Sequence, residues 1–215
     1  MSQRPLTSRL KRATQALHGV AERAGSMSEL LRGRVERSSY CLMLRNLHAL
    51  YEALEAALDR HEHLPLVGPV RLPVLYRAGA LADDLRQLHG TGWNELRLTE
   101  AMHSYVARLD HLSRTRPPLL AAHAYVRYMG DLSGGQILRE VVRRGLRLTD
   151  GAGTAFYTFA GDADAEAIKH AFRAALDALP VDDDLAQDIV AEARDSFALH
   201  IRLFEELDRA SATPG

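Results

Sequence analysis

The chain has 215 residues, of which 47% are hydrophobic, and this is enough apolar surface to build one compact domain. Its 27 basic and 28 acidic residues nearly cancel and form no long block of one sign, which argues against a nucleic-acid interface and favours small molecules or proteins as partners. The single cysteine, Cys41, excludes an internal disulfide framework and is consistent with the cytoplasm, which is the expected location.

Apolar residues recur at helical spacing along almost the whole sequence, whereas runs of alternating β-branched residues are nearly absent. We therefore expect an all-α protein, a single-domain multi-helix bundle of seven or eight helices that spans residues 1–215. The first helix is expected to begin near Thr7 or Ser8 and to stop at Gly25, because glycine favours the end of a helix.

The other helices follow from apolar stripes and from residues that favour a helix start. The longest stripe runs from Tyr40 to Leu58 and has the width of a buried helix face. Thr99 is expected to begin a helix, and Pro117 and Pro118 are expected to open the next one. These two helices are expected to cover residues 99–112 and 119–146. The others are expected at 75–88, 163–179 and 182–209, with an irregular stretch at 150–161.

Neither end of the sequence resembles a targeting segment. Residues 1–17 contain no apolar run followed by small residues, and the last residues, LFEELDRASATPG, are polar. We expect no signal peptide and no membrane anchor, with flexible ends over about residues 1–6 and 210–215.

Three glycines, Gly130, Gly134 and Gly135, lie within six residues of the helix expected at 119–146. Each costs about 0.8 to 1 kcal/mol relative to alanine inside a helix, so something must offset roughly 2 to 3 kcal/mol. A phosphate-binding loop fits poorly, since Gln136 rather than a lysine follows the last glycine. A plain turn between two helices and a kinked helix that exposes bare backbone to a flat ligand both remain open.

His18 lies on the first predicted helix, where a lone histidine is more often a surface residue than a ligand. Its neighbours change this balance. Lys11 lies two turns earlier, about 10.5 Å along the helix, and Glu22 lies one turn later. One helix face thus offers a metal ligand, a cation for a carboxylate group, and a carboxylate that either orients the imidazole or is a solvated partner.

The segment HAYVRYMGDLSGGQIL, which spans His123 to Leu138, resembles the signature segment of heme oxygenases. The resemblance extends through LKRATQALHGVAE near Lys11, LHALYEALE, AMHSYVARL and FYTF to SFALHIRLFEEL near Leu207. It implies the helical fold of that family and an enzyme that uses O2 and an external electron donor, a reductase or a ferredoxin. The substrate it implies is heme b, which is also the cofactor, and the implied products are biliverdin, with the IX-alpha isomer favoured, carbon monoxide and ferrous iron.

The resemblance also implies roles for individual residues. His18 matches the proximal iron ligand, with Glu22 beside it, and Asp131 matches the distal aspartate, which acts through water. On the residues alone, a structural role for Asp131 as a cap or bridge between helix turns stays open. The glycines matched to the distal helix over the heme are Gly130, Gly134 and Gly135. The other residues matched to heme contacts are Lys11, Tyr125, Lys169 and Arg173. The predicted catalytic set consists of Asp131, Gly130 and three members of the distal hydrogen-bond network, namely Tyr51, Tyr105 and Arg127.

Three positions depart from the vertebrate pattern of that family. Gln15 stands where a second propionate-facing lysine occurs, and Tyr76 stands where a histidine occurs. His200 stands where an asparagine of the distal network occurs. The position at which the ring opens is therefore less well determined than the class of reaction.

Two other kinds of function fit parts of the sequence. A heme-binding carrier or sensor on the same fold needs His18 but not the distal aspartate. A thiamine-degrading hydrolase with Cys41 as nucleophile, or a di-iron carboxylate oxidase, fits less well. Cys41 lies in an apolar run, where a structural thiol is more common. Glu100 and His103 form one Glu-x-x-His pair, whereas a di-iron bundle needs two.

Overall fold

The structure is a computed structural model that describes residues 4–149, 151–159 and 162–212. Within these ranges the chain forms eight α-helices, five short 3-10 helices and no β-strand, which confirms the all-α prediction. The α-helices are α1 (Leu6–Glu22), α2 (Gly25–Leu31), α3 (Arg37–Arg60), α4 (Ala78–Leu88), α5 (Glu100–Thr115), α6 (Leu120–Gly145), α7 (Asp162–Asp177) and α8 (Asp183–Ala212). The 3-10 helices are η1 (Gly68–Val70), η2 (Pro73–Leu75), η3 (Trp93–Glu95), η4 (Pro117–Leu119) and η5 (Ala155–Tyr157).

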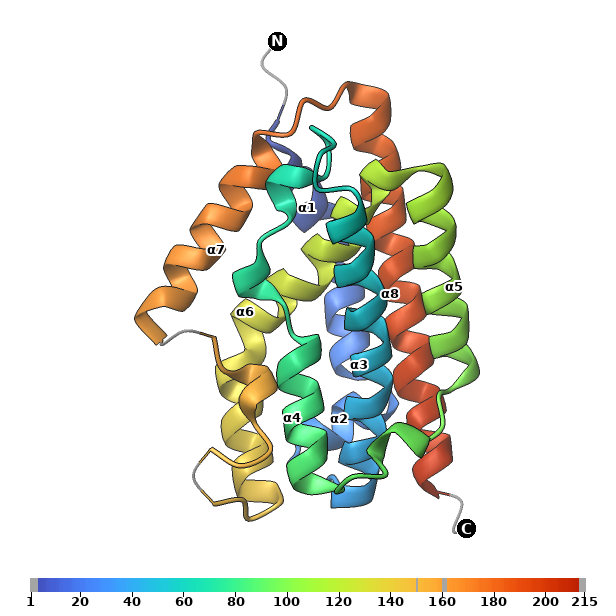
Figure 1. The fold of residues 1–215 in the computed structure, drawn as a ribbon, viewed down its shortest axis with the longest axis vertical. Coiled ribbons are helices and arrows are strands. Elements are labelled where there is room, and N and C mark those ends of the chain that lie inside the picture. The colour runs from blue at the N-terminus through green and yellow to red at the C-terminus, as the bar shows by residue number, and fades with distance from the viewer. Residues whose placement is uncertain (1–3, 150, 160–161, 213–215) are drawn as a thin grey trace.

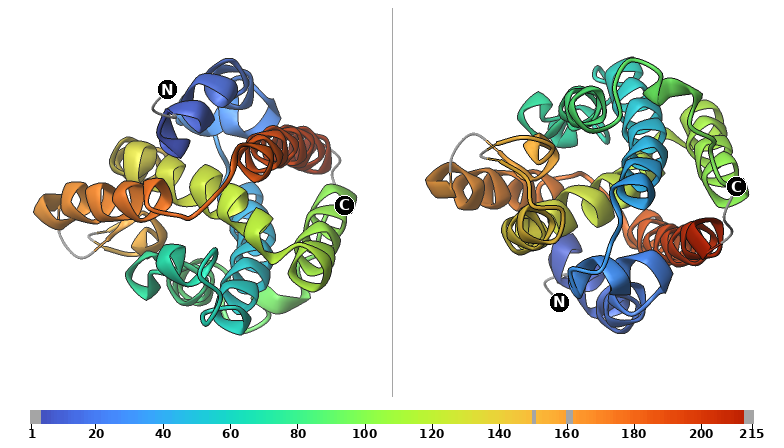
Figure 2. Two further views of the ribbon diagram at one scale, coloured as in Figure 1. Left: turned by 90° about the horizontal axis from the view of Figure 1, so that it is seen from above. Right: turned by 90° about the horizontal axis from the view of Figure 1, so that it is seen from below.

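Most helices run along one long axis, and α6 crosses the middle of the molecule (Figure 1). Seen along that axis, α1 and α2 lie on one side of α6, and α3 and α4 lie on the other (Figure 2). α5 and α8 stand side by side, and α8 also packs along α1. α7 projects from the side of the bundle next to α6, so that α1, α6 and α7 meet around one region.

The apolar stripe predicted from Tyr40 to Leu58 forms the centre of the core on α3. Its fully buried members include Tyr40, Leu44, Leu50, Tyr51, Leu54 and Leu58. α5 begins where the sequence predicts, because the hydroxyl of Thr99 accepts a hydrogen bond from the backbone N of Met102 at 3.1 Å. This is the bond that a threonine makes when it caps a helix.

The first helix ends earlier than predicted. α1 stops at Glu22 and Gly25 begins the short helix α2, so the predicted stop at Gly25 was wrong and α2 was missed. Gly25 has a positive φ of 32°, and a Cβ there would lie 2.2 Å from the carbonyl oxygen of Phe204 on α8. Glycine is therefore required by the close approach of two segments that are distant in the sequence.

Other boundaries differ by a few residues. α4 begins at Ala78 rather than at residue 75, because Pro73–Leu75 forms η2. Leu6 already begins α1 and is buried, and α8 runs to Ala212, so helical structure covers part of both expected flexible ends. The parts of the expected ends and of the expected irregular stretch that lie outside the described residues are 1–3, 213–215, 150, 160 and 161.

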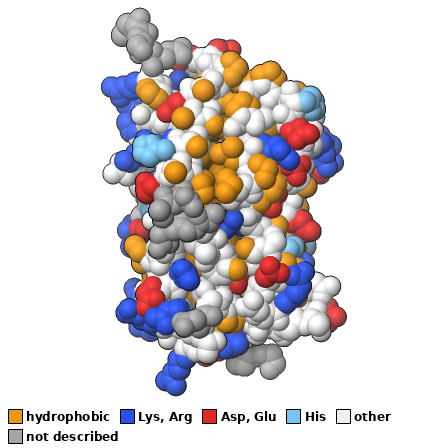
Figure 3. Space-filling view, turned by 60° about the vertical axis from the view of Figure 1, so that its left-hand side comes forward, with side chains coloured by type: hydrophobic (Ala, Val, Ile, Leu, Met, Phe, Trp, Pro, Cys, Tyr) orange, Lys and Arg blue, Asp and Glu red, His pale blue; other side chains and the backbone are white. Residues whose placement is uncertain are grey.

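The side of the molecule that carries α7 shows hydrophobic side chains gathered near its middle and basic side chains at its edges (Figure 3). The large hydrophobic residues that are exposed, among those described, are Val20, Leu31, Val74 and Ile137. None of the described helices combines the length and the apolar character that crossing a membrane requires.

Candidate active site

A cleft lies between α1 and α6, with further walls from α7 and α8. It has two lobes, and both are lined by His18, Val126, Gly130 and Phe197. The basic lobe has a volume of about 350 Å³, and its other lining residues include Lys11, Gln15, Tyr125, Lys169 and Arg173. The apolar lobe has a volume of about 180 Å³, and its other lining residues include Met27, Leu31, Met43, Ile137, Leu138 and Phe204. One continuous cleft is thus cationic at one end and largely apolar at the other.

The α6 wall of the cleft includes a strip of bare backbone at Gly130 and Gly134. α6 runs unbroken through all three glycines, so the alternative of a plain turn was wrong. Figure 1 shows the helix changing direction along its length, as expected of a helix kinked at a Ser-Gly pair. Gly130 and Gly134 line the cleft, and a Cβ built on either would meet no neighbouring group within 4 Å. A flat ligand can therefore lie directly against this helix.

Gly135 does not belong to that strip. A Cβ there would lie 3.5 Å from the carbonyl oxygen of Tyr157, and Gly135 lines neither lobe. Gly135 instead faces η5, where a Cβ would make an ordinary van der Waals contact. The structure therefore separates Gly135 from the other two glycines of the predicted ligand-binding set.

His18 faces the same cleft from α1. Its imidazole is 56% exposed, and its Nδ1 lies 3.5 Å from Oε1 of Glu22, one helical turn away. The ring of Phe197 on α8 meets the imidazole edge-on, with 6.2 Å between the ring centroids. The imidazole is thus accessible from the cleft and held between a carboxylate and an aromatic ring.

The cations of the basic lobe come from two helices. Lys11 lies on α1, and Lys169 and Arg173 lie on α7. Nζ of Lys169 lies 3.2 Å from Oε1 of Glu166, which is largely exposed. Gln15 lines the same lobe, so this departure from the family pattern bears directly on its charge.

Asp131 is buried in the wall of the apolar lobe, and its two carboxylate oxygens have different donors. Nη2 of Arg127 donates to Oδ1 at 3.0 Å, and the hydroxyl of Tyr51 donates to Oδ2. Arg127 also donates from Nε to the hydroxyl oxygen of Tyr51 at 3.0 Å. Burial raises the pKa of Asp131 above its usual range, while Arg127 and Tyr51 act in the opposite direction. The carboxylate is fixed in position by two side chains.

His200 is the third side chain, after Asp131 and Tyr51, that accepts a hydrogen bond from Arg127. Its Nδ1 lies 2.8 Å from the carbonyl oxygen of Ser196, which only accepts, so Nδ1 carries the proton. Its Nε2 accepts from Nη1 of Arg127 at 2.9 Å. Burial, followed by the positive charge of Arg127, lowers the pKa of His200 well below its usual range. His200 is therefore a neutral imidazole of defined tautomer.

A second buried polar cluster joins residues of α5, α6 and α8. The hydroxyl of Tyr105 lies 2.6 Å from Oγ of Ser196 and 3.1 Å from Nδ1 of His123. Nε2 of His123 and Nε of Arg108 contact the same oxygen of Glu192, at 2.9 and 3.0 Å. Burial alone would raise the pKa of Glu192, but the hydrogen bonds from His123 and Arg108 lower it to about 2. Tyr105 also contacts the Asp131 network, because its ring meets the ring of His200 edge-on with 5.0 Å between the centroids.

Two further buried carboxylates hold segments near the cleft. Glu55 accepts a hydrogen bond from the backbone N of Arg77 at 2.5 Å. Asp84 accepts from the backbone N atoms of Ala155 and Phe156, each at 2.8 Å. Burial raises the pKa of Glu55 to about 7 and that of Asp84 to about 6. Phe156 lines the apolar lobe, so Asp84 positions part of its wall.

The cleft brings together most of the residues singled out from the sequence. Those in its wall are Lys11, His18, Glu22, Tyr125, Arg127, Gly130, Asp131, Gly134, Lys169 and Arg173. Tyr51 and Tyr105 are fully buried and line neither lobe. Tyr76 donates to Oδ1 of Asp59 at 2.6 Å and also lines neither lobe, so this departure from the family pattern does not reach the cleft.

The aromatic wall on α8 and the role of Glu192 were not predicted from the sequence. Phe197 and Phe204 line the cleft with His200 between them, and this i, i+3, i+7 spacing in SFALHIRLF is a signal that was available. Glu192 has no such local signal, because His123 and Arg108 are 69 and 84 positions away in the chain.

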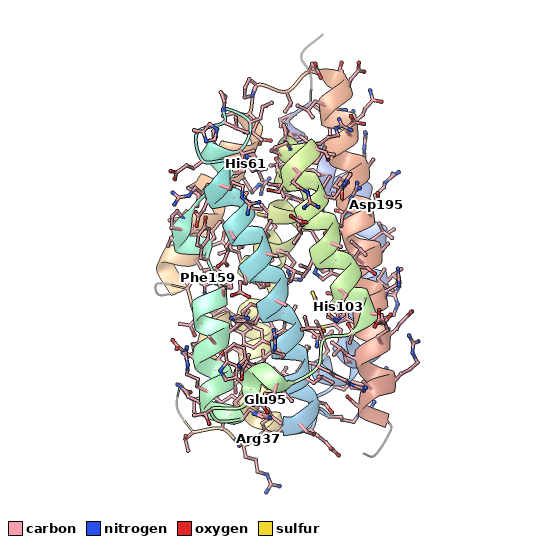
Figure 4. All side chains as sticks on the ribbon, turned by 45° about the vertical axis from the view of Figure 1, so that its right-hand side comes forward. Arg37, His61, Glu95, His103, Phe159 and Asp195 are labelled. Atoms are coloured by element: carbon pink, nitrogen blue, oxygen red, sulfur yellow. The ribbon has the colours of Figure 1, made fainter. Side chains whose placement is uncertain are left out.

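The alternatives of a di-iron enzyme and a cysteine hydrolase find no support. The described residues contain no group of three or more His, Cys, Asp or Glu side chains that could hold a metal ion. Glu100 and His103 are exposed, and Figure 4 shows His103 on α5 well apart from His61 at the end of α3. Cys41 is buried, and burial raises the pKa of its thiol, which disfavours the nucleophilic thiolate.

Comparison with known proteins gives one consistent result. The sequence matches the heme oxygenase family over residues 4–206. Heme oxygenase 1 of Synechocystis sp. is 39% identical over 204 residues, which cover 94% of this chain and 85% of that protein. The structure of heme oxygenase from Leptospira interrogans has a TM-score of 0.91 and 38% identity, covering 94% of this chain and 100% of that one. Heme oxygenase-1 from Synechocystis sp. in complex with heme also has a TM-score of 0.91 and 38% identity, covering 96% of this chain and 94% of its own.

The fold and the cleft define an all-helical protein with a cleft between α1 and α6, open along Gly130 and Gly134. The chain belongs to the heme oxygenase family. It is an enzyme that degrades heme, and the alternative of a carrier or sensor is set aside.

Proposed function

We propose that this heme oxygenase opens the heme ring at the α-meso carbon. His18 is proposed as the iron ligand, and Asp131 is proposed to direct the delivery of protons. One observation carries the proposal: a single cleft pairs an accessible imidazole on α1 with bare backbone at Gly130 and Gly134 on α6. A planar ring fits between these two walls, because no side chain on that strip of α6 fills the space. Heme, when bound, supplies the iron at which O2 reacts and the ring carbon that is oxidised.

The contact between His18 and Glu22 supports the assignment of the ligand atom. Nδ1 of His18 faces the Glu22 carboxylate at 3.5 Å, so we assign Nε2 to the iron. Glu22 then keeps the proton on Nδ1 and restricts rotation of the ring, as outer hydrogen-bond partners of metal-binding histidines commonly do.

Asp131 is the group we assign to proton delivery. Because Arg127 and Tyr51 occupy one lone pair on each carboxylate oxygen, the carboxylate points in a fixed direction and keeps lone pairs for water. Burial raises its pKa, which brings proton exchange at this carboxylate closer to neutral pH. We infer that a water held by Asp131 donates the proton, so the carboxylate acts at one remove from the substrate.

The charge difference between the lobes supports one orientation of the substrate. Lys11, Lys169 and Arg173 are assigned to the two propionates, and the apolar lobe is assigned to the methyl and vinyl edge. In this orientation, Gly130 and Asp131 would lie beside one edge of the ring and would favour reaction there. This orientation is the basis for expecting the α isomer of biliverdin.

The electrons are proposed to come from a separate reductase or ferredoxin. The rim of the basic lobe supports a transient docking site there, because exposed positive charge attracts an acidic partner and speeds association. The cytoplasmic location stays a prediction.

Aerobic turnover of the protein reconstituted with hemin, with a reductant and catalase present, tests the proposal. The expected result is loss of the Soret band, growth of a biliverdin band and release of carbon monoxide, with chromatography identifying the α isomer. His18→Ala is expected to lose the spectrum of imidazole-ligated iron and to bind hemin more weakly. Asp131→Ala is expected to bind hemin normally and to form biliverdin about a hundredfold more slowly, the usual effect of losing a proton donor.

His103→Ala and Asp195→Ala are the matched controls. Both residues are exposed, on α5 and α8 (Figure 4), and both variants are expected to behave as the wild-type protein. An unchanged ferric spectrum in His18→Ala would remove His18 from the ligand role. A wild-type yield of biliverdin in Asp131→Ala would do the same for the assignment of Asp131.

A further inference from the structure

The two helices that carry the cations of the basic lobe are joined by one carboxylate. Thr7, on the first turn of α1, donates from its backbone N to Oδ1 of Asp177 and from its hydroxyl to Oδ2, each at 2.8 Å. Thr7 is buried, and the two residues are 170 positions apart. Figure 1 shows this end of α7 beside the N-terminal end of α1.

The negative charge of Asp177 stabilises the N-terminal end of α1 rather than its own helix, α7. α1 follows Pro5, which gives no side-chain capping bond, and the first turn of α1 has no acidic residue. A carboxylate at that end satisfies a free backbone N–H and interacts favourably with the helix dipole. Asp177 is also the last residue of α7, where the dipole disfavours a negative charge. The bridge between two helices therefore explains the aspartate better than the local stability of α7 does.

The bridge lies one helical turn from a cation on each side. Lys11 follows Thr7 by four residues on α1, and Arg173 precedes Asp177 by four residues on α7. Residues four apart share a helix face, and Thr7, Lys11 and Arg173 all line the basic lobe. Sliding α7 along α1 would have to break the bridge, so the bridge fixes the spacing of the two cationic turns.

We propose that Asp177 is a positioning residue that sets the separation of Lys11 and Arg173 and thereby the affinity of the basic lobe for a ligand with two carboxylates. The inference rests on the proposed function, in which those carboxylates are the heme propionates. Asp177 acts through the two cations, without touching the ligand. Holding their helices in register before binding reduces the conformational freedom that is lost on binding.

Affinities for hemin and for hemin dimethyl ester, in which both carboxylates are masked, separate this role from a general loss of structure. Asp177→Ala is expected to weaken hemin binding roughly three- to tenfold, the effect of leaving one flexible side chain unordered before binding. Its affinity for the diester is expected to stay unchanged. Asp177→Asn keeps an acceptor for the Thr7 amide, and its Nδ2 can donate to the Thr7 hydroxyl oxygen in place of the bond that the hydroxyl donates now, so it is expected to restore hemin affinity. Thr7→Val keeps one of the two bonds and is expected to show a smaller loss with the same selectivity.

Asp183→Ala is the matched control. Asp183, at the start of α8, pairs with Arg9 of α1 at 3.0 Å, but Arg9 does not line the basic lobe. This variant is expected to bind hemin and the diester as the wild-type protein does. In ligand-free Asp177→Ala, the backbone amide of Thr7 is expected to exchange its hydrogen faster than in the wild-type protein.

Two results would overturn the inference while leaving the proposed function intact. One is equal weakening of hemin and diester binding in Asp177→Ala and Thr7→Val, which would indicate a purely structural role. The other is wild-type affinity for both compounds in both variants. Absence of hemin binding to the wild-type protein would instead overturn the proposed function, and this inference with it.

Discussion

Alanine at Gly134 is expected to make the ligand-free protein more stable and a poorer binder of hemin. A Cβ at this position would meet no neighbouring group within 4 Å, so nothing in the ligand-free protein opposes it. Alanine is favoured over glycine inside a helix by about 0.8 to 1 kcal/mol. For a chain of this length, that gain corresponds to a rise in Tm of roughly 2 to 4 °C.

The same methyl group lies where we propose the flat ring binds. Forcing an extra methyl into a closely packed contact costs about 1 to 3 kcal/mol, so the affinity of Gly134→Ala for hemin is expected to fall about tenfold. Thermal unfolding without ligand and a hemin titration measure the two effects on one preparation. A higher Tm together with a lower affinity for hemin is the informative result, because ordinary damage to the fold lowers both quantities.

Gly135→Ala is the matched control for that variant. Its Cβ would lie at an ordinary contact distance, 3.5 Å, from the Tyr157 carbonyl and outside the cleft. It is expected to gain similar helix stability and to keep wild-type affinity for hemin. If Gly134→Ala destabilised the ligand-free protein, or if Gly135→Ala lost as much hemin affinity, the account of the bare strip would be refuted.

Three further predictions concern the buried polar groups. His200→Leu leaves Nη1 of Arg127 without its acceptor and is expected to lower the free energy of unfolding by about 1 to 3 kcal/mol, measured by denaturant titration; an unchanged midpoint would contradict this. Glu55 has a pKa raised from 4.5 to about 7, so its contribution to stability is complete below pH 4.5 and is lost as the pH rises through 7. In the wild-type protein the free energy of unfolding is therefore expected to fall by about 3 kcal/mol between about pH 4.5 and 7 on account of Glu55. Glu55→Gln is expected to remove this fall, and an unaltered pH profile would argue against it. Glu192 has the opposite sign: its pKa is lowered from 4.5 to about 2, so its contribution is present above pH 4.5 and is lost as the pH falls toward 2. Glu192→Gln leaves His123 without its carboxylate and is expected to cost about 3 kcal/mol at neutral pH, whereas a variant of wild-type stability would show that the pair contributes nothing.

The long helices could be predicted from the sequence because their signals are local. The stripe that begins at Tyr40 and the cap at Thr99 depend on residues within a few turns, and both appear where expected. Gly25 shows where such reasoning fails. From its neighbours in the sequence, Gly25 is predicted to end a helix. Glycine is in fact needed there because the backbone of Phe204 approaches closely, and no local pattern reveals that contact.

The site divides in the same way. His18, Lys11 and Glu22 share one helix face, so their common location in the cleft wall follows from spacing alone. The bridge from Thr7 to Asp177 joins residues 170 positions apart, and it exists only because the fold returns α7 to the start of α1. Contacts of this kind need the tertiary structure, since either residue by itself is typical of an exposed polar position.

With heme placed against Gly130 and Gly134 as proposed, binding of the substrate would also protect the protein from degradation. Glycines weaken a helix, and local opening begins where few contacts support the backbone. Proteases cleave a chain from such opened states, whereas a ligand that binds only the closed state suppresses opening by mass action. We expect molecules without heme to be degraded first, so that the amount of enzyme in a cell follows the supply of heme.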